Sequence, residues 1–418
     1  MKFLMTLFQI QDYGGIINHA EYLALGMKEL GHTVDFRVLV PRDKIVQRTS
    51  VPKDIHEYST LGTGYKFHQA RGWYGIPKVP YLSKYHRNIF KEKCSEYDAV
   101  LWHIPVPTMN KDNKDVYQWL DLYDNGTKNI AIIHDGNLPE LYPHLLKVTD
   151  QFHACACVHE SAFISGDILP IPRKLILNPF QMKSYPDYLP FHRRNGFAAI
   201  QVFKAWKRVD TLIRAIPYMS TTESKMVGGE GIEYRYMTSK DKCKPKYFNS
   251  EGERIWDIAL QCGMEHLGTV RNEVVLEHLR KVKLQIDPSY SKKYSSFGAH
   301  FNRTTVEAMI QGAVPMATDW GMKNSKIFTA GQNYIEIPAE CPPSLFADII
   351  DDGLTNQKQW EEIVENNYEL CKLFDMKNVA QDYVSLVKSE TEVQIGKPTP
   401  ETVQKCNKNL HFFSVAPI

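Results

Sequence analysis

The sequence has almost no net charge and no long hydrophobic run. Its 50 Lys and Arg residues face 48 Asp and Glu residues, a formal charge of +2, so polyanion binding by the molecule as a whole is not expected. No stretch reaches the roughly 18 consecutive apolar residues that a membrane helix needs, and the opening MKFLMTLFQIQ lacks a signal-peptide cleavage site. These absences predict a cytoplasmic chain without a membrane span.

Paired cysteines and the common phosphate loops are also absent. The eight cysteines are scattered and include no CxxC, which gives no support for a disulfide framework or a zinc site and suits a reducing compartment. Cys155 and Cys157 alternate with alanine, a pattern that favours a buried strand over a pair of metal ligands. Neither a GxGxxG nor a GxxxxGK(S/T) motif occurs. We therefore expect no metal site and no standard phosphate loop.

Length and composition indicate a globular protein of several domains. At about 150 residues per domain, 418 residues suggest two or three domains, and 43% hydrophobic with 23% charged residues is enough for buried cores. Residues 2–8 and 33–40 have the length and composition of strands. Between them, apolar spacing from Ile16 predicts an amphipathic helix that Gly31 ends. This βαβ order implies a parallel sheet.

The rest of the pattern predicts the α/β class, with two doubly wound, Rossmann-like domains in succession. Further strands are expected at residues 98–104, 129–133, 154–158, 174–177, 197–203, 225–231, 283–287 and 314–318. We assign residues 1–182 to an N-terminal domain, 196–370 to a C-terminal domain and 371–418 to a returning helix and tail, with 183–195 as a linker. Ligands of such sheets bind outside the carboxyl ends of the strands, so two domains facing across a cleft favour a two-substrate transferase.

Two short segments at predicted strand ends can bind anions. Gly14 and Gly15 separate a strand from a helix N-terminus, where free backbone N–H groups and the helix dipole favour a phosphate. Lys204 and Lys207 lie in the run FKAWKR, after a strand and before a helix, so they can neutralise a diphosphate. The plainer alternatives, a structural turn and a solvated charge run, stay open on these residues alone.

The segment 287–309 has the richest chemistry. A strand ends, a glycine-containing loop follows, and a helix is expected to begin near Thr304 or Thr305 and to close at Gly312. Its free N–H groups could hold a phosphate while Glu307 reaches a ribose diol. Glu307 could equally be a first-turn charge that complements the helix dipole. The donor-binding candidates here are Phe301, Asn302, Arg303, Thr304 and Glu307.

Taken together, these motifs resemble the retaining family-4 glycosyltransferases of the GT-B fold, over residues 1 to about 385. The matching pieces are Gly14-Gly15 in the first glycine loop, Ile176 to Pro179 at the interdomain element, Lys207 at the diphosphate-binding lysine, Gly229-Glu230-Gly231 at the GxG turn and Glu307-Ala308-Met309 at the donor-site helix. The resemblance implies a UDP-sugar donor in the C-terminal domain. It also implies a hydroxyl acceptor in the N-terminal domain and retention of configuration, without an essential metal or other cofactor.

The resemblance assigns roles to individual side chains. Lys207, with help from Lys204, would neutralise the leaving diphosphate, and Glu307 would hold the ribose. His134, at a predicted strand end, would line the sugar site, so His134 and Lys207 are the catalytic candidates. His103 is a weaker candidate of the same strand-end type.

Two positions depart from the family pattern. Ala299, followed by His300, stands where the family's first motif glutamate is expected, and Arg208 stands where glycine usually follows the lysine. Because the missing carboxylate often contacts the sugar, the donor-sugar preference cannot be carried over. The departures indicate a divergent branch.

Residues 41–93 carry a large positive charge, although the net charge of the whole chain is close to zero. Eleven Lys and Arg residues against four acids give this segment +7, with aromatic residues interleaved. Cations that follow phosphates and aromatics that stack on bases are typical of nucleic-acid binding, whereas the plainer interpretation is a solvated loop with local aromatic packing. The acceptor-binding candidates are Lys66, Arg71, Trp73, Tyr74, Lys78, Lys84 and Arg87.

Three interpretations of the acceptor stay open. The preferred one is DNA with a 5-hydroxymethylated pyrimidine that flips out of the stack, which resembles the bacteriophage DNA glucosyl- and arabinosyltransferases. The second is the same chemistry on a lipid-linked or polysaccharide acceptor, although the N-terminal region has no obvious basic amphipathic helix. The third is a nonenzymatic nucleic-acid- or sugar-binding protein, which Ala299 favours and the retention of Lys207 and Glu307 disfavours.

Overall fold

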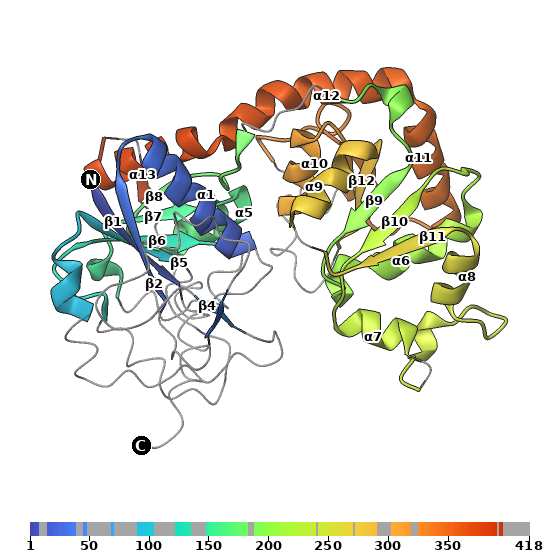
Figure 1. The fold of residues 1–418 in the computed structure, drawn as a ribbon, viewed down its shortest axis with the longest axis horizontal. Helices are drawn as coiled ribbons and strands as arrows, with labels where there is room; N and C mark the ends of the chain where they lie inside the picture. Colours follow the sequence, from blue (N-terminus) through green and yellow to red (C-terminus); the bar gives the residue numbers. More distant parts are fainter. Residues whose placement is uncertain are drawn as a thin grey trace. The chain divides into compact units, whose positions relative to one another are not determined.

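The chain forms two compact units. The structure is a computed structural model that describes residues 1–7, 15–38, 45–47, 68–70, 90–103, 122–134, 148–182, 188–239, 241–270, 272–290, 302–318, 325–390 and 393–395. The first unit comprises Met1–Gln181 and Leu373–Ile418, and the second comprises Met182–Lys372 (Figure 1).

A seven-stranded sheet forms the centre of the first unit. Its strands, in sheet order, are β15 (Gln394–Ile395), β8 (Pro172–Leu175), β7 (Ala154–Cys157), β6 (Lys128–Ile133), β5 (Ala99–His103), β1 (Lys2–Leu7) and β2 (Thr33–Val38). Neighbours pair in parallel except β15, which is antiparallel to β8. A separate antiparallel pair consists of β3 (Ile45–Gln47) and β4 (His68–Ala70).

Alternate residues of these strands enter two different cores. Phe3 and Met5 of β1 pack with residues of α1 (Gly15–Glu29) and α13 (Met376–Lys388). Leu4, between them, packs on the opposite face with Trp102 and with Ala162 of α5 (Glu160–Ser165). Side chains alternate across a strand, so runs that are apolar on both sides form a parallel sheet that is covered on both faces.

Helices α1 and α13, from opposite ends of the chain, lie side by side (Figure 1). A Cβ added to Gly26 would lie 2.1 Å from the main-chain oxygen of Met376, so glycine permits this close approach. Gly31 follows α1 with φ +80°, which confirms the predicted helix end and uses the left-handed conformation that glycine favours.

The second unit contains a six-stranded parallel sheet. In sheet order its strands are β11 (Met264–Gly268), β10 (Lys225–Gly228), β9 (Phe197–Ile200), β12 (Leu284–Asp287), β13 (Val314–Thr318) and β14 (Ile335–Ile337). Its helices are α6 (Val209–Ala215), α7 (Ile232–Thr238), α8 (Ile255–Gln261), α9 (Asn272–Lys281), α10 (Arg303–Ile310), α11 (Pro343–Thr355) and α12 (Gln357–Cys371). Numbered by sequence, the strand order is 3-2-1-4-5-6, that of the dinucleotide-binding α/β fold.

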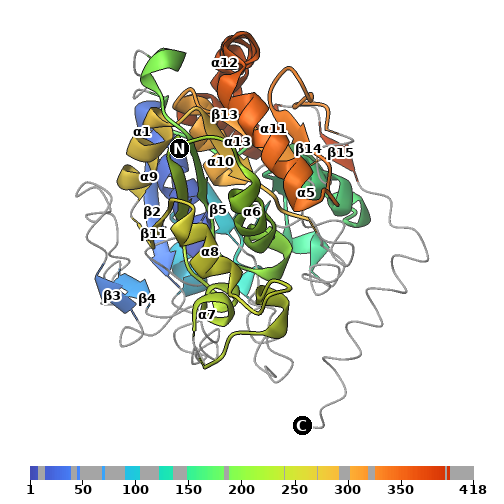
Figure 2. The ribbon, with the colours of Figure 1, turned by 90° about the vertical axis from the view of Figure 1, so that its right-hand side faces the viewer.

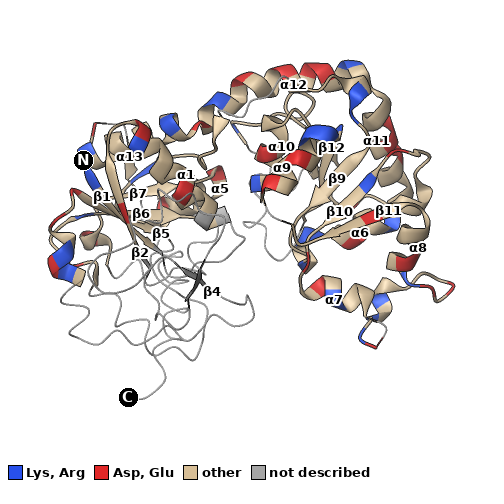
Figure 3. Cartoon of the chain, viewed as in Figure 1, with Lys and Arg blue, Asp and Glu red and all other residues tan. Residues whose placement is uncertain are grey.

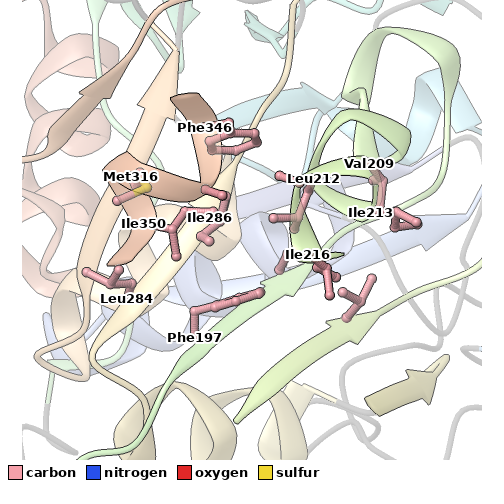
Figure 4. Close-up of a cluster of buried hydrophobic side chains, with 14 of the residues drawn as sticks. Phe197, Val209, Leu212, Ile213, Ile216, Leu284, Ile286, Met316, Phe346 and Ile350 are labelled. Carbon is pink, nitrogen blue, oxygen red and sulfur yellow. The ribbon is translucent and has the colours of Figure 1, made fainter. Parts of the chain in front are cut away.

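Helices cover both faces of this sheet. On one face, Phe197 and Met316 of the strands meet Leu212 of α6 and Phe346 of α11 (Figure 4). Helices α6, α8 and α11 lie toward the viewer in Figure 2. On the other face, Ala198 packs against residues of α9 and α10. The two sheets, parallel except at β15, confirm the predicted α/β class.

Acidic side chains predominate along α12, whose sequence QKQWEEIVENNYELC has four Glu and one Lys (Figure 3). Across the described ranges, no helix is both long and apolar enough to cross a membrane.

Candidate functional site

The predicted cations reach the point where the winding of the second unit's sheet reverses. In the order β11-β10-β9-β12-β13-β14, the reversal falls between β9 and β12, and the carboxyl ends of such strands are where these sheets bind ligands. The chain leaves β9 toward Lys204 and Lys207, and β12 ends in Asp287. The fold therefore places charged groups of both signs after neighbouring strands at the switch point of the sheet.

Lys207 is a buried cation in a polar setting. It closes the 3-10 turn Ala205–Lys207 and is only 6% exposed. Its Nζ atom donates a hydrogen bond to Oδ1 of Asn302 and lies 4.2 Å from the centroid of the Trp206 ring. Burial lowers the pKa of Lys207 to about 8, the carboxylate of Asp287 opposes this shift, and Lys204 adds to it. Such a cation gains charge stabilisation from an anionic ligand.

Arg208 explains how the chain turns from this lysine into α6. It adopts φ +48°, in the left-handed region that favours glycine, which accounts for the glycine that the resemblance expects here. Its guanidinium donates to the main-chain oxygen of Ala339 at 2.7 Å and lies 5.4 Å from the Tyr290 ring centroid. These contacts hold the strained turn in place.

Helix α10 begins earlier than the sequence predicts. Its first residue is Arg303, within one or two residues of the expected start near Thr304 or Thr305, but the N-cap residue is Asn302 and neither threonine. The Thr305 hydroxyl is buried and lacks a hydrogen-bond partner among the described residues. Gly312, with φ +72°, follows the helix as expected.

Asn302 links Lys207 to a buried carboxylate instead of capping its helix. No side-chain hydrogen bond caps α10, and the Asn302 Nδ2 group donates to Oδ2 of Asp287. Asp287 is 5% exposed and its Oδ1 accepts from the backbone N–H of Ser289 at 3.2 Å and from the Ser289 hydroxyl. Asp287 and Ser289 are not among the sequence-predicted site residues, although a polar pair directly after a buried strand was the available signal.

Glu307 is a buried carboxylate one turn into α10. It is 4% exposed, and its Oε1 accepts from Nε of Arg303 at 3.2 Å and from Nδ2 of Asn272 at 3.4 Å. Burial raises the pKa of Glu307, while Arg303 opposes this shift. The first turn of α10 contains no acidic residue, so the alternative of a first-turn dipole charge is wrong.

The GxG turn aligns the loops that follow β9 and β10. Gly229 has φ +105°, and an added Cβ there would lie 2.1 Å from the main-chain oxygen of Gln201. A Cβ on Gly231 would lie 2.4 Å from the oxygen of Phe203. The Phe203 N–H donates to the oxygen of Glu230 at 3.0 Å. The glycines therefore let one backbone pack on the other and hold the segment that leads to Lys204.

The first unit brings three histidines together at the ends of β5 and β6. Nδ1 of His103 lies 3.2 Å from Nε2 of His134, and the His19 ring centroid lies 5.3 Å from that of His103 and 4.9 Å from that of His134. His19 is held by Oδ1 of Asn178 at 2.8 Å and by the hydroxyl of Tyr383 at 3.3 Å. The sequence predicted His103 and His134 as candidate site residues. It did not predict His19, which lies within the helix expected from Ile16 onward.

Burial keeps His103 and His134 neutral. It lowers the pKa of both His103 and His134 well below the usual value, and neighbouring imidazoles act in the same direction. Nε2 of His103 is buried and lacks a hydrogen-bond partner in the described parts of the chain. Two neutral imidazoles can share one hydrogen bond as donor and acceptor, so His134 is positioned by its neighbours.

Several predicted site residues fall outside the described ranges. These are Gly14, Phe301, Ala299, His300 and all seven acceptor-binding candidates: Lys66, Arg71, Trp73, Tyr74, Lys78, Lys84 and Arg87. Gly15 is the first residue of α1. The described residues contain no group of three or more His, Cys, Asp or Glu side chains that could hold a metal ion.

Comparison with family models and with curated proteins finds no match, whereas solved structures match almost the whole chain. Anabaena HepE in complex with UDP-glucose covers 93% of this chain and 100% of its own, with a TM-score of 0.63 and 13% identity. An alpha-glucosyltransferase in complex with UDP-glucose and DNA containing an abasic site covers 93% and 99%, with a TM-score of 0.62 and 13% identity. TarM covers 92% and 98%, with a TM-score of 0.62 and 12% identity. At this identity the likeness concerns the fold, and the fold of the chain is GT-B.

Proposed function

We propose that the protein is a retaining glycosyltransferase that moves glucose or arabinose from a UDP-sugar to a hydroxyl acceptor. The observation that carries the proposal is the arrangement of Lys207 and Glu307. A buried ammonium and a buried carboxylate stand at the switch point of a 3-2-1-4-5-6 sheet, where nucleotides bind in this class of fold. The structural neighbours crystallised with UDP-glucose add support.

The chemistry follows from the charges. Departure of UDP leaves negative charge on the diphosphate, and a fixed cation in a desolvated site stabilises that charge in the transition state. Lys207 supplies the cation, with Lys204 in the same turn region. Glu307 can accept hydrogen bonds from the ribose hydroxyls. His134, kept neutral by burial, can donate or accept a hydrogen bond at the sugar without adding charge.

For the acceptor we propose a 5-hydroxymethylated pyrimidine in bacteriophage DNA. The support is the +7 segment with interleaved aromatics at residues 41–93 and the neighbour that was solved with DNA. The hydroxymethyl group supplies the nucleophilic oxygen, and base flipping brings it to the sugar.

Mass spectrometry tests donor and acceptor together. Duplex DNA with hydroxymethylcytosine, and the same duplex with cytosine, are incubated with the protein and a panel of UDP-sugars. We expect a mass increment of one sugar on the modified duplex alone, lost in Lys207→Ala. Transfer to lipid-linked or polysaccharide acceptors but not to DNA would support the glycosyltransferase activity and contradict DNA as the acceptor. If no pair of donor and acceptor gives either transfer or donor hydrolysis, the proposed glycosyltransferase activity is wrong.

A salt series tests the DNA acceptor without catalysis. Contacts between cations and phosphates release counterions, so the affinity for the modified duplex should fall steeply as salt rises. Tight binding with an affinity that does not change with salt concentration would contradict a DNA acceptor bound by residues 41–93. So would the absence of binding at low salt.

A further inference from the structure

Asp287 is a carboxylate with no role in the function proposed above, yet it is fixed from several sides. It ends β12, and its Oδ1 atom is bound by the N–H and hydroxyl of Ser289. The main-chain oxygen of Ser289 accepts from the Thr318 hydroxyl at 2.5 Å. A buried carboxylate is costly to keep unless its hydrogen bonds are satisfied. Here Ser289, just after β12, and Asn302, the N-cap residue of α10, supply them, and Thr318 of β13 holds Ser289 in turn.

The Asn302 amide has one possible orientation between its two charged neighbours. Its oxygen accepts from the Lys207 ammonium and its NH₂ group donates to Asp287. The opposite orientation would point N–H groups at the ammonium and oxygen at the carboxylate. The amide dipole therefore lies along the line from the negative to the positive group and couples them.

The other charged groups near Lys207 cannot replace Asp287. Lys204 has the same sign. The guanidinium of Arg208 is engaged by Ala339, and on α10 the buried Glu307 pairs with Arg303. Among the described residues, Asp287 is the carboxylate that acts on the Lys207 ammonium.

We propose that Asp287 is a positioning residue: through the Asn302 amide it fixes the Lys207 ammonium at the switch point and keeps it charged for an anionic ligand. The identity of that ligand as the diphosphate of a UDP-sugar rests on the proposed function. The linkage itself rests on the hydrogen bonds from Lys207 to Asn302 and from Asn302 to Asp287.

The titration of Lys207 measures this linkage directly. The ¹³Cε signal of Lys207, assigned with Lys207→Arg, is followed by NMR from neutral to strongly alkaline pH in the full chain. Wild type should titrate near pH 8. In Asp287→Asn the midpoint should fall by about one pH unit, the low end for a lost opposite charge. Asp210→Asn, on α6, is the matched control and should leave the midpoint unchanged.

Two further variants separate linkage from folding. Asn302→Leu keeps the carboxylate but breaks the connection, so it should also lower the midpoint. Asp287→Asn with Asn302→Asp puts a carboxylate beside the ammonium and should restore it. An unchanged midpoint in folded Asp287→Asn, or in Asn302→Leu if the first variant does not fold, would overturn the proposal.

Calorimetric titration with UDP separates this proposal from the proposed function. A shift of one unit would reduce the protonated fraction of Lys207 at pH 8 from about one half to about one tenth, so Asp287→Asn should bind UDP about fivefold more weakly there. Shifted midpoints with no UDP binding by wild type would uphold the linkage and reject the nucleotide. UDP binding by wild type with unshifted midpoints would support the nucleotide site and reject the linkage of Asp287 to Lys207.

Discussion

Nδ1 of His103 lies 3.2 Å from Nε2 of His134, and burial lowers the pKa of both residues. One imidazole donates and the other accepts, which fixes how the two rings are oriented toward each other. His159 extends the network, since its Nε2 atom lies 2.9 Å from the main-chain oxygen of His134.

Replacement of His134 should affect the transfer step more than donor binding. In His134→Ala we expect kcat to fall about 100-fold, the lower range for loss of one proton-handling or hydrogen-bonding group, with the affinity for UDP within about twofold of wild type. Steady-state kinetics and UDP titration measure the two quantities. If kcat stays at the wild-type value, His134 has no catalytic role.

Buried histidines at the ends of β5 and β6 and before α5 should make the first unit less stable in acid. Burial lowers the pKa of His103, His134 and His159, the last to about 4, so below about pH 6.5 the unfolded chain binds more protons than the folded one. The free energy of unfolding should therefore decrease as pH falls through 6.5 toward 5, with a slope that approaches about 1.4 kcal/mol per pH unit for each such group.

Urea denaturation at several pH values checks this dependence. His103→Gln should flatten the slope because one of the lowered groups is removed. His192→Gln is the control, since His192 is exposed, and it should follow the wild-type curve. Stability that is flat or rises on acidification would show that the buried histidines are not held neutral.

Replacement of Glu307 should weaken the binding of UDP more than the binding of a UDP analogue that lacks the 2′- and 3′-hydroxyls. If its carboxylate binds the diol, Glu307→Gln should lower the affinity for UDP about tenfold, as expected for hydrogen bonds to a charged group. The affinity for 2′,3′-dideoxy-UDP should stay nearly unchanged. The exposed Glu273 on α9 provides the control, Glu273→Gln. Equal weakening of both nucleotides would assign Glu307 a structural role through Arg303 instead.

The contact of α1 with α13 should be intolerant of a single methyl group. In Gly26→Ala the new Cβ meets the Met376 oxygen, so the helices must separate, at a cost of about 1–3 kcal/mol in unfolding free energy. Lys28→Ala, at an exposed position of the same helix, should stay within about 0.5 kcal/mol. Denaturant midpoints compare the two, and equal stabilities would contradict this packing.

Strand positions followed from apolar runs, and a strand was missed where polar residues interrupt the run. The prediction of residues 314–318 is confirmed by β13 with the same bounds, because all five residues are buried. The prediction of 197–203 runs too far, since β9 ends at Ile200 and Phe203 enters the core from the loop. Edge strand β11 was missed because its polar, partly exposed residues interrupt the apolar pattern.

Site residues were predictable where one segment carries the motif. Lys207 and Glu307 stand in recognisable local patterns, and the structure places both as buried charges. His19 depends on Asn178 and on Tyr383, which is 364 residues away in sequence. Asp287 acts through Asn302, fifteen residues on. The partners in these contacts come from other elements of the tertiary fold, so a local pattern can point to Asp287 but not to the residue through which it acts.

Calorimetric titration of the full chain with UDP, in parallel for wild type and Lys207→Ala, tests the central claim most directly. The account predicts saturable binding by wild type, weakened about 100-fold or more when the buried cation is removed, with the fold preserved by circular dichroism. Absence of binding by wild type, or equal binding by both proteins, would contradict a UDP-sugar site built around Lys207.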